Sequence, residues 1–408
     1  MAINLWYDYV SSNQIVNNLI SKDLRNEYLL DSTRRSGNNF LRYNAELPNF
    51  LKNAGIPFSL NFSQAIPYLK DYNWNETQYL PIEFNFFKSA EPKDLNFVDS
   101  FFLKNGKANT EFFVWFPHEA PDKVSTEYFE LLNKNYPHIP IRFAHGNLRT
   151  PKWIADQDFI NYRAFDYFWW VQQQFPRTVL DKNKEEVHTF TFYNHRSRSF
   201  RAIPYYSLLT ANKLVGAKAT YHGYSDNSEN STDIVNYSIQ REQGEIPCEY
   251  LNFTQDVKFL DWLNLNSSSS FNFQHFDFVN LSLHSDSYLD FSTETYPFEK
   301  DDHFFVTEKT YRPIASGCIF LTLSQPGMLK YLKSKGIQTF DDLFDESYDT
   351  TSHWYNRWKI IEKNIDIWLS LGKEGRKDYY KKSFDKLVHN QNVFYSRDFA
   401  EEIRKLFQ

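Results

Sequence analysis

The stretch that decides the fold runs from Val306 to Leu321 and reads VTEKTYRPIASGCIFL. Thr307 is a favoured N-cap residue, and Gly317 suits the position after the last helical residue, so the pattern predicts a helix over Thr307–Ser316. The apolar run Cys318–Leu323 has the composition of a buried strand. A helix that leads directly into a buried strand is typical of an α/β protein.

Strand-like apolar runs alternate with longer helical patterns on both sides of this stretch, which favours βαβ units and parallel sheet. The other predicted strands are Ile3–Tyr9, Phe112–Phe116, Ile139–Ala144, Val187–Tyr193 and Phe278–His284. The other predicted helices are Ser11–Leu24, Thr126–Asn135, Ser199–Leu214, Asp256–Leu263, Gly327–Ser334, His353–Leu371 and Arg397–Phe407.

The length of 408 residues favours two domains with some insertion. A segment dense in aromatic residues, Trp153–Phe175, closes the first half, and the charged run Asp181–Glu186 precedes a new strand, so we expect the linker there. The predicted organisation is a Rossmann-like domain over residues 1–180, a second Rossmann-like domain over residues 187–375, and a helical segment over residues 376–408 that packs back on the first domain.

Composition excludes several classes of protein. Hydrophobic residues make up 41% and aromatic residues 19% of the chain, which is incompatible with disorder. A net charge of −6 argues against a protein dominated by non-specific phosphate contacts. Two cysteines exclude a disulfide scaffold, and we find no signal peptide and no apolar run long enough to span a membrane. We therefore expect a cytoplasmic protein.

The start of the helix after Val306 carries charges that suit a nucleotide. A helix N-terminus attracts anions through its free N–H groups and its dipole. Lys309 in the first turn and Arg312 one turn later add positive charge, which predicts a diphosphate site. Glu308 shares a face with Arg312 and can accept hydrogen bonds from ribose hydroxyls. The alternative is a capped surface helix with one weak Glu–Arg pair.

This stretch resembles the donor-binding motif of GT-B glycosyltransferases, including the fucosyltransferase type, in which a Glu-Lys pair opens the helix that meets the nucleotide. A longer match is to glycosyltransferases of bacteriophages and other large viruses. Its motifs correspond here, in order, to Thr307-Glu308-Lys309-Thr310, Pro326-Gly327, Tyr331-Leu332, Gly336-Ile337-Gln338-Thr339-Phe340 and Glu346-Ser347-Tyr348-Asp349. The resemblance covers residues 187–350 well and the N-terminal half only loosely.

Two further segments resemble the same group. The turn Asn194-His195-Arg196-Ser197-Arg198-Ser199-Phe200-Arg201 is similar to its Asn-Arg-x-x-Arg-x-x-Arg turn, in which arginines can clamp phosphate. It departs from that pattern at His195, and Pro204 is expected to interrupt the helix that follows. A basic surface loop is the alternative. Upstream of Val306, Glu294 is a candidate to contact the sugar or to order the loop, and a solvated carboxylate is its alternative.

The resemblance makes the N-terminal half the acceptor side, where an inverting enzyme needs a general base. His118 and Glu119 follow the strand Phe112–Phe116, at the end where ligand-facing groups lie in parallel sheets. Asp8, at the end of the first strand, is another candidate base, and His145-Gly146-Asn147 follows the strand Ile139–Ala144. A loop-capping carboxylate is the alternative for Glu119.

Other chemistries have weaker support. A metal-dependent GT-A transferase needs an Asp-x-Asp element, and Asp156-Gln157-Asp158 is such a triplet, but it lies in an aromatic, helix-like segment with no strand before it. The chain lacks H-E-x-x-H spacing, a G-x-G-x-x-G turn and a G-x-S-x-G elbow. A carbohydrate-binding or virion structural protein remains the non-enzymatic alternative.

The resemblance thus implies an α/β protein of GT-B type, with two Rossmann-like domains facing across a cleft. It implies transfer of a sugar from a nucleotide-diphosphate donor, a UDP- or GDP-sugar, to a hydroxyl acceptor, with no metal ion. The acceptor is a 5-hydroxymethylpyrimidine of viral DNA or a host or virion glycan. The expected donor-binding residues are Asn194, Arg196, Arg198, Arg201, Glu294, Thr307, Glu308, Lys309 and Arg312.

Overall fold

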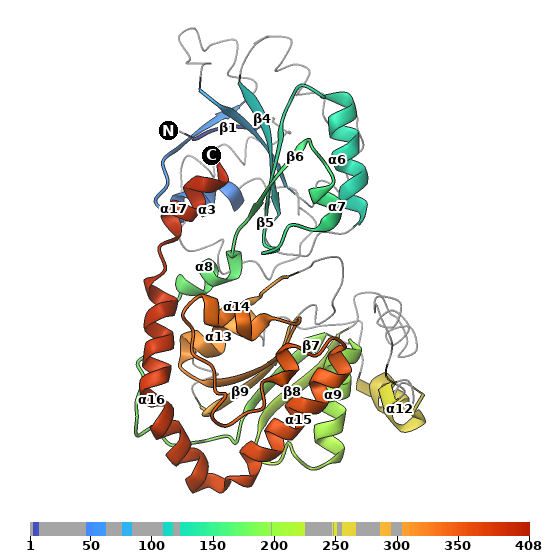
Figure 1. The fold of residues 1–408 in the computed structure, drawn as a ribbon, viewed down its shortest axis with the longest axis vertical. Helices are drawn as coiled ribbons and strands as arrows, with labels where there is room; N and C mark the ends of the chain where they lie inside the picture. Colours follow the sequence, from blue (N-terminus) through green and yellow to red (C-terminus); the bar gives the residue numbers. More distant parts are fainter. Residues whose placement is uncertain are drawn as a thin grey trace. The chain divides into compact units, whose positions relative to one another are not determined.

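The computed structural model divides the chain into two compact units (Figure 1). The first comprises residues 1–167 with 398–408, and the second residues 168–397. The predicted helix Ser11–Leu24, the predicted strand Phe278–His284 and the candidate bases lie outside the residues that the structure describes. Those described residues are 3–7, 46–62, 76–83, 109–116, 123–196, 198–224, 247, 249–250, 255–266, 286–294 and 304–408.

The first unit is built on a parallel sheet with the strand order β2-β1-β3-β4-β5-β6. Three of the predicted strands, those at Ile3, Phe112 and Ile139, are confirmed as β1, β4 and β5. The strands are β1 (Ile3–Tyr7), β2 (Phe58–Phe62), β3 (Gln78–Glu83), β4 (Thr110–Phe116), β5 (Ile141–His145) and β6 (Ile160–Ala164).

Side chains of β4 alternate between the two faces of this sheet. Phe112 stacks edge-on against Tyr136, which follows α6, and Phe113 and Trp115 point to the other face. There Trp115 contacts Phe50 of α3 at a ring separation of 4.6 Å. The apolar run of β4 is therefore covered on both sides, as a central parallel strand requires. The helices of this unit are α3 (Glu46–Asn53), α6 (Lys123–Asn135), α7 (Lys152–Ala155) and α17 (Phe399–Leu406).

The C-terminus of the chain is anchored on the first sheet. The Phe407 ring, just after α17, stacks on Phe113 of β4 at 4.4 Å. The Tyr79 hydroxyl of β3 donates to the Phe407 carbonyl at 2.6 Å, and Arg142 of β5 donates to the Leu406 carbonyl at 3.4 Å. The last eleven residues thus belong to the first unit although they follow the second in sequence.

The second unit is built on a four-stranded parallel sheet with the order β10-β9-β7-β8. Its strands are β7 (Thr191–Arg196), β8 (Lys218–Tyr224), β9 (Leu289–Thr293) and β10 (Ile319–Leu323). Its helices are α8 (Tyr167–Gln173, in this unit from Phe168), α9 (Ser199–Thr210), α12 (Val257–Asn266), α13 (Glu308–Ser316), α14 (Met328–Ser334), the short 3-10 helix Ser347–Asp349, α15 (Trp354–Ser370) and α16 (Gly372–Ser396).

The direction of the connections reverses between β7 and β9. The chain passes from β7 through α9 to β8 on one side, and from β9 through α13 to β10 on the other. Because parallel crossovers are right-handed, these opposite directions place α9 and α13 on opposite faces. In Figure 1, α13 packs beside α16, and α15 packs beside α9. The predicted α/β class with two Rossmann-like units is therefore confirmed, and their arrangement across a cleft stays a prediction.

The helix predicted from the opening stretch is confirmed as α13. Thr307 is its N-cap and accepts a hydrogen bond from the Lys309 N–H. Gly317 ends it with a φ of 67°, and a Cβ there would lie 2.2 Å from a Leu180 methyl carbon, so only glycine fits. The expected interruption at Pro204 is wrong, because α9 continues through that residue and loses only the hydrogen bond that its missing N–H would donate.

The charged run Asp181–Glu186 lies within the second unit and is bound along α16. Arg376 of α16 holds Glu186 through two nitrogens, at 2.8 and 2.7 Å, and both side chains are nearly buried. The Lys184 ammonium lies over the rings of Tyr288 and Tyr380, which stack on each other. Among the described residues, no helix is long and apolar enough to cross a membrane.

Candidate functional site

The carboxyl ends of β7 and β9 lie side by side where the connections of the second sheet reverse. Ligands of open α/β sheets bind in the crevice at such a point. Asn194 of β7 and Thr293 of β9 are buried there, and the Thr293 hydroxyl donates to Asn194 Oδ1 at 2.8 Å. This bond fixes the amide of Asn194, whose Nδ2 has no hydrogen-bond partner among the residues that the structure describes.

The first turn of α13 begins beside these strand ends and is held by Glu294. Glu294 is 0% exposed. It accepts the Thr307 N–H at 3.1 Å on one oxygen and the Thr307 hydroxyl at 2.6 Å on the other. The Thr310 hydroxyl donates to it as well. The spacing of Thr307 and Thr310 places both hydroxyls on one side of the helix, so one carboxylate can bind both.

Glu308 and Lys309 form an ion pair at the same helix start. Lys309 Nζ lies 2.6 Å from Glu308 Oε1, and the side chains are only 14% and 21% exposed for Lys309 and Glu308. Burial by itself would raise the pKa of Glu308, but the charges of Lys309 and Arg312 outweigh it and hold that pKa at about 2. Glu308 is therefore an anion, and an acceptor of hydrogen bonds, throughout the physiological pH range.

Positive charge accumulates around this ion pair. Arg312 of α13 is buried, and its charge acts on both Glu308 and Tyr193 of β7. Burial lowers the pKa of Lys309 against the pull of Glu308, and the nearby charge of Arg201 lowers it further. Since Arg201 belongs to α9, the first turns of α9 and α13 bring their basic side chains close enough for their charges to interact.

The start of α9 carries positive charge and no acidic residue. Its N-cap is Arg198, whose side chain does not cap the helix, and the buried Arg201 lies in the first turn. The Ser199 hydroxyl is buried and has no hydrogen-bond partner within the described part of the chain. Cations at a helix N-terminus oppose the helix dipole. An anion at this position would relieve that repulsion.

The structure places eight of the residues expected to bind the donor at the ends of β7 and β9 and at the starts of α9 and α13. Asn194, Glu294 and Thr307 form the buried frame, and the charged members of the group surround it. For Arg196 the structure describes only the backbone, as the last residue of β7. Sequence reasoning missed Thr293 and Thr310 as site residues, although the spacing of the two threonines in Thr-Glu-Lys-Thr was a usable signal. The charged members are Arg198, Arg201, Glu308, Lys309 and Arg312.

In the first unit, His145 is buried at the end of β5. Its Nδ1 accepts the Asn147 N–H at 2.7 Å, and the Tyr162 hydroxyl of β6 donates to the Asn147 carbonyl. Burial raises the pKa of Tyr162 well above its ordinary value. These contacts tie the ends of β5 and β6 together, which is a structural role. Asp8, His118 and Glu119 lie outside the described residues and stay candidates for the base.

The Asp-x-Asp triplet lies at the amino ends of the strands of the first sheet, opposite to the carboxyl ends where ligands are expected. Asp156 ends α7, and Asp158 precedes β6, so both lie where a strand begins rather than where it ends. Both are exposed. The triplet therefore occupies a turn, and the expectation of a helical setting is wrong. No group of three or more potential metal-ligating side chains occurs among the residues that the structure describes.

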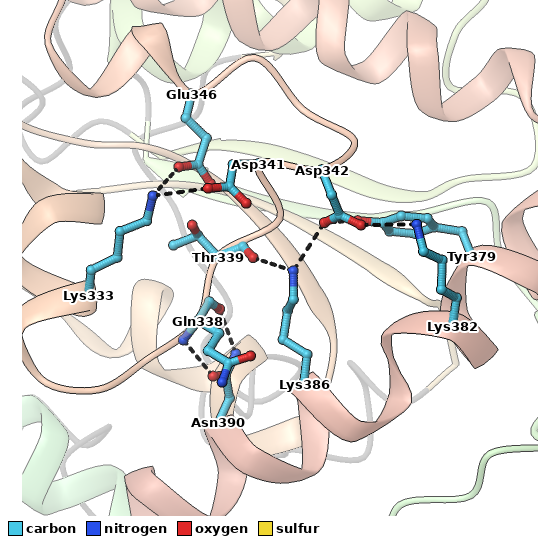
Figure 2. A network of polar contacts seen from close by, with 10 residues as sticks. All are labelled: Lys333, Gln338, Thr339, Asp341, Asp342, Glu346, Tyr379, Lys382, Lys386 and Asn390. Carbon is cyan, nitrogen blue, oxygen red and sulfur yellow. Dashed lines mark hydrogen bonds and ion pairs between the residues drawn. The ribbon is translucent and has the colours of Figure 1, made fainter.

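In the second half of the long motif, polar contacts join the loop after α14 to α14 and α16 (Figure 2). We call this group the clamp, and it consists of Lys333, Gln338, Asp342, Glu346, Tyr379, Lys386 and Asn390. Lys333 pairs with Glu346 at 2.7 Å, across the loop that follows α14. Asn390 of α16 accepts the Gln338 N–H at 2.7 Å and donates to the Gln338 carbonyl at 2.8 Å. Asp342 accepts from Tyr379 and pairs with Lys386, both on α16. These residues hold the loop in place.

Asp349, the last residue of the motif, caps α14. Its two carboxylate oxygens accept the N–H groups of Leu329 and Lys330 at 2.8 and 3.0 Å, and its carbonyl accepts the Gly327 N–H at 2.7 Å. The motif thus divides into a part at the strand ends, Thr307–Thr310, and a structural part after β10.

Comparison with known proteins finds distant likenesses only. No protein-family model matches the chain, and no curated protein matches it in sequence. Among solved structures it is similar to T4 phage β-glucosyltransferase, with a TM-score of 0.35 and 9% identity over 97% of this chain and 98% of that one. It is also similar to an α1,3-fucosyltransferase solved with GDP, with a TM-score of 0.28 and 8% identity over 97% and 93%. The assignment of site residues therefore depends on the side-chain geometry.

Proposed function

We propose that the second unit binds a nucleotide-diphosphate sugar and that the chain is a glycosyltransferase. The observation that carries the proposal is the meeting of Arg201, Lys309 and Arg312 beside Glu308, where the strand connections reverse, with Arg198 at the N-cap of α9. A nucleoside diphosphate needs both kinds of group, cations for its phosphates and an acceptor for its ribose hydroxyls. The sequence resemblance to GT-B donor motifs supports the same assignment.

In this proposal the diphosphate binds at the start of α9. That end carries two arginines and a buried serine hydroxyl, and the side chain of its N-cap residue, Arg198, does not cap it. Arginine can bind phosphate oxygens through two nitrogens, and a helix N-terminus adds backbone N–H donors. The amide of Asn194, oriented by Thr293, offers a further donor on the strand beside it.

Glu308 and Lys309 then divide the remaining contacts. Glu308, anionic at neutral pH, would accept the ribose hydroxyls. Lys309, held now by Glu308 at 2.6 Å, would contribute its charge to the phosphate nearest the sugar. Positive side chains that offset charge on the leaving diphosphate stabilise the transition state electrostatically. We propose that they do so without a metal ion.

The proposed reaction is a displacement at the anomeric carbon of the sugar. The oxygen of the acceptor hydroxyl forms a bond to the anomeric carbon of the sugar, and the bond from that carbon to the diphosphate breaks. The diphosphate leaves with the bonding electrons, and the hydroxyl proton passes to a base. We propose Asp8, His118 or Glu119 of the first unit for that base.

The resemblance to phage enzymes favours the hydroxymethyl group of a modified pyrimidine in viral DNA as the acceptor. Such an enzyme must draw the base out of the helix and must offer local positive charge to the phosphate backbone. A glycan hydroxyl of the host or virion is the alternative acceptor. Incubation with the donor identified below, separately with hydroxymethylated DNA and with glycan arrays, distinguishes the two by mass spectrometry of the products.

The first experiment is a thermal-shift screen with UDP, GDP, CDP and ADP, each with and without Mg²⁺. We expect one of them to raise the melting temperature without metal, because a ligand that binds only the folded state stabilises it. Lys309→Ala should lower the affinity for that nucleotide by about 30-fold or more, the usual cost of losing a charge-assisted hydrogen bond.

Two outcomes of this screen contradict the proposal. If no nucleotide stabilises the protein but free sugars do, it is a carbohydrate-binding protein. If stabilisation requires Mg²⁺, the charge compensation assigned to the basic side chains is wrong, and Asp156 and Asp158 become the residues to test. Lys333→Ala serves as the matched control, because it removes a lysine of the same unit from the clamp rather than from the strand ends.

A further inference from the structure

We propose that Glu294 is a positioning residue, which fixes Lys309 through the hydroxyl of Thr307 and does not itself touch the sugar. The inference rests on the proposed nucleotide site, because Lys309, the group that Glu294 positions, is assigned to the diphosphate there. The sequence allows two roles for this carboxylate, contact with the sugar and ordering of the loop. The hydrogen bonds of Glu294 favour the second role.

The carboxylate of Glu294 is fully engaged by the protein. One oxygen accepts the Thr307 N–H and the Thr310 hydroxyl, and the other accepts the Thr307 hydroxyl at 2.6 Å. The side chain is 0% exposed. To contact a sugar it would have to release these bonds and leave the two threonines unsatisfied in a buried place, which is costly.

The hydroxyl of Thr307 passes this constraint on to Lys309. A hydroxyl has a single proton to donate, and the Thr307 hydroxyl donates it in the hydrogen bond to Glu294. The hydroxyl oxygen can then accept hydrogen bonds through its lone pairs. It lies 3.3 Å from the backbone nitrogen of Lys309 and 3.4 Å from Lys309 Nζ. One hydroxyl thus caps the helix and restrains the ammonium group, and Glu294 sets its direction.

A glutamine at position 294 would disturb this arrangement. Its amide group keeps one acceptor oxygen but presents an N–H₂ donor to one of the groups that now donate to the carboxylate. If that group is the Thr307 hydroxyl, its proton must turn away from residue 294, toward the Lys309 N–H and ammonium, which are donors themselves. The restraint on Lys309 is then replaced by a repulsive contact, while the volume of the side chain is unchanged.

A double-mutant cycle tests this role, with the nucleoside diphosphate that stabilises the wild-type protein most as the probe. We expect Glu294→Gln to weaken binding about tenfold in the wild-type background, the effect of a hydrogen bond to a charged group. In the Lys309→Ala background the same change should weaken binding less than twofold. A purely structural role predicts the same loss in both backgrounds, and that result overturns the proposal.

Two further variants serve as controls. Thr307→Ser keeps the hydroxyl and should bind the nucleotide within about twofold of wild type, whereas Thr307→Val should reproduce the tenfold loss. Asp290→Asn changes another buried carboxylate of the same sheet, which accepts from Thr191 at 2.6 Å. We expect the effects of Asp290→Asn and Lys309→Ala on nucleotide affinity to be additive. A coupling energy as large as that of Glu294 would mean that the action of Glu294 through Thr307 on Lys309 is not specific.

A measurement without nucleotide separates failure of this inference from failure of the proposed function. The pH dependence of acylation at Lys309, followed by peptide mass spectrometry, reports the state of its ammonium group. We expect the midpoint to move to lower pH in both Glu294→Gln and Thr307→Val. Glu294→Gln also removes a charge that acts on Lys309 directly, so Thr307→Val decides. If wild-type protein binds no nucleotide but the midpoint moves in Thr307→Val, the donor site is wrong and the action of Glu294 through Thr307 stands. An unchanged midpoint in Thr307→Val refutes it.

Discussion

Two helices of the second unit begin after strands of the same sheet, and their N-termini differ in charge. At α14, the carboxylate of Asp349 accepts two backbone N–H groups, so an acidic side chain of the protein already occupies the helix end. At α9, the N-cap is Arg198 and the first turn contains Arg201, with no acidic residue. One end is complete by itself, and the other gathers charge of the sign that a helix N-terminus disfavours.

The difference agrees with the proposal that the start of α14 serves stability and the start of α9 serves binding. A helix that needs only to be stable should carry an acceptor at its start, as α14 does. At α9, the anionic ligand that we propose would offset the unfavourable charges of the helix end. The start of α13 is intermediate, because neutral Thr307 caps it while Glu308 and Lys309 remain partly accessible.

The largest effect on stability is expected from Asp349→Ala. The change removes two hydrogen bonds at a nearly buried helix end, so it should lower the free energy of unfolding by about 2 kcal/mol. Urea unfolding of the full chain measures it. Nucleotide affinity should stay within about twofold, and Asp341→Asn, in the exposed part of the same loop, should change neither quantity. A large loss of affinity in Asp349→Ala would mean that the start of α14 also takes part in nucleotide binding, which contradicts the contrast with α9.

The second prediction concerns the pH dependence of stability at α13. The pKa of Glu308 is about 2 in the folded protein and about 4.3 in an unfolded chain, so the group favours folding when it is ionised. Its contribution, about 2 kcal/mol after allowance for partial exposure, is complete above pH 5 and is lost as the pH falls from about 5 to 2.

Unfolding of wild type and Glu308→Gln at a series of pH values measures this contribution. The difference between the two proteins should be constant above pH 5 and should shrink steadily below it. A difference that does not depend on pH would mean that the pair with Lys309 contributes through packing rather than charge.

The smallest effect is expected from Arg198→Ser, and it has opposite signs for stability and binding. Serine supplies the missing N-cap of α9 and should raise the free energy of unfolding by about 1 kcal/mol. The same change should weaken binding of the nucleoside diphosphate by about tenfold, because a phosphate contact is lost. Thermal unfolding and calorimetry on one protein measure both. If stability and affinity fall together, the charge at this end is structural.

Local signals were enough to predict the elements whose ends are set by their own residues. The N-cap Thr307 and the left-handed Gly317 define α13 from sequence, and the apolar run of β4 defines a central strand. By contrast, β9 was not predicted. Its Asp290 looks like a residue of an exposed turn, but it is buried because Thr191, 99 residues away, donates to it. A partner so distant leaves no local pattern.

The candidate site was predictable to the same extent. The charges of Glu308, Lys309 and Arg312 follow from their helical spacing. The pairing of Asn194 with Thr293 depends on the order of strands in the sheet, which periodicity does not specify. The direction of Glu294 into the helix start, away from any ligand, likewise depends on two threonines thirteen and sixteen residues further along.

The bonds between the charged run Asp181–Glu186 and α16 determine where the second unit can be truncated for expression by itself. A fragment that begins at residue 187 and stops at residue 375 would lose Glu186, Lys184 and most of α16, and would expose the Tyr288 ring that Tyr380 covers. A fragment of residues 168–397 keeps each of these contacts within one polypeptide. Expression of the second unit alone should therefore start and stop at those residues.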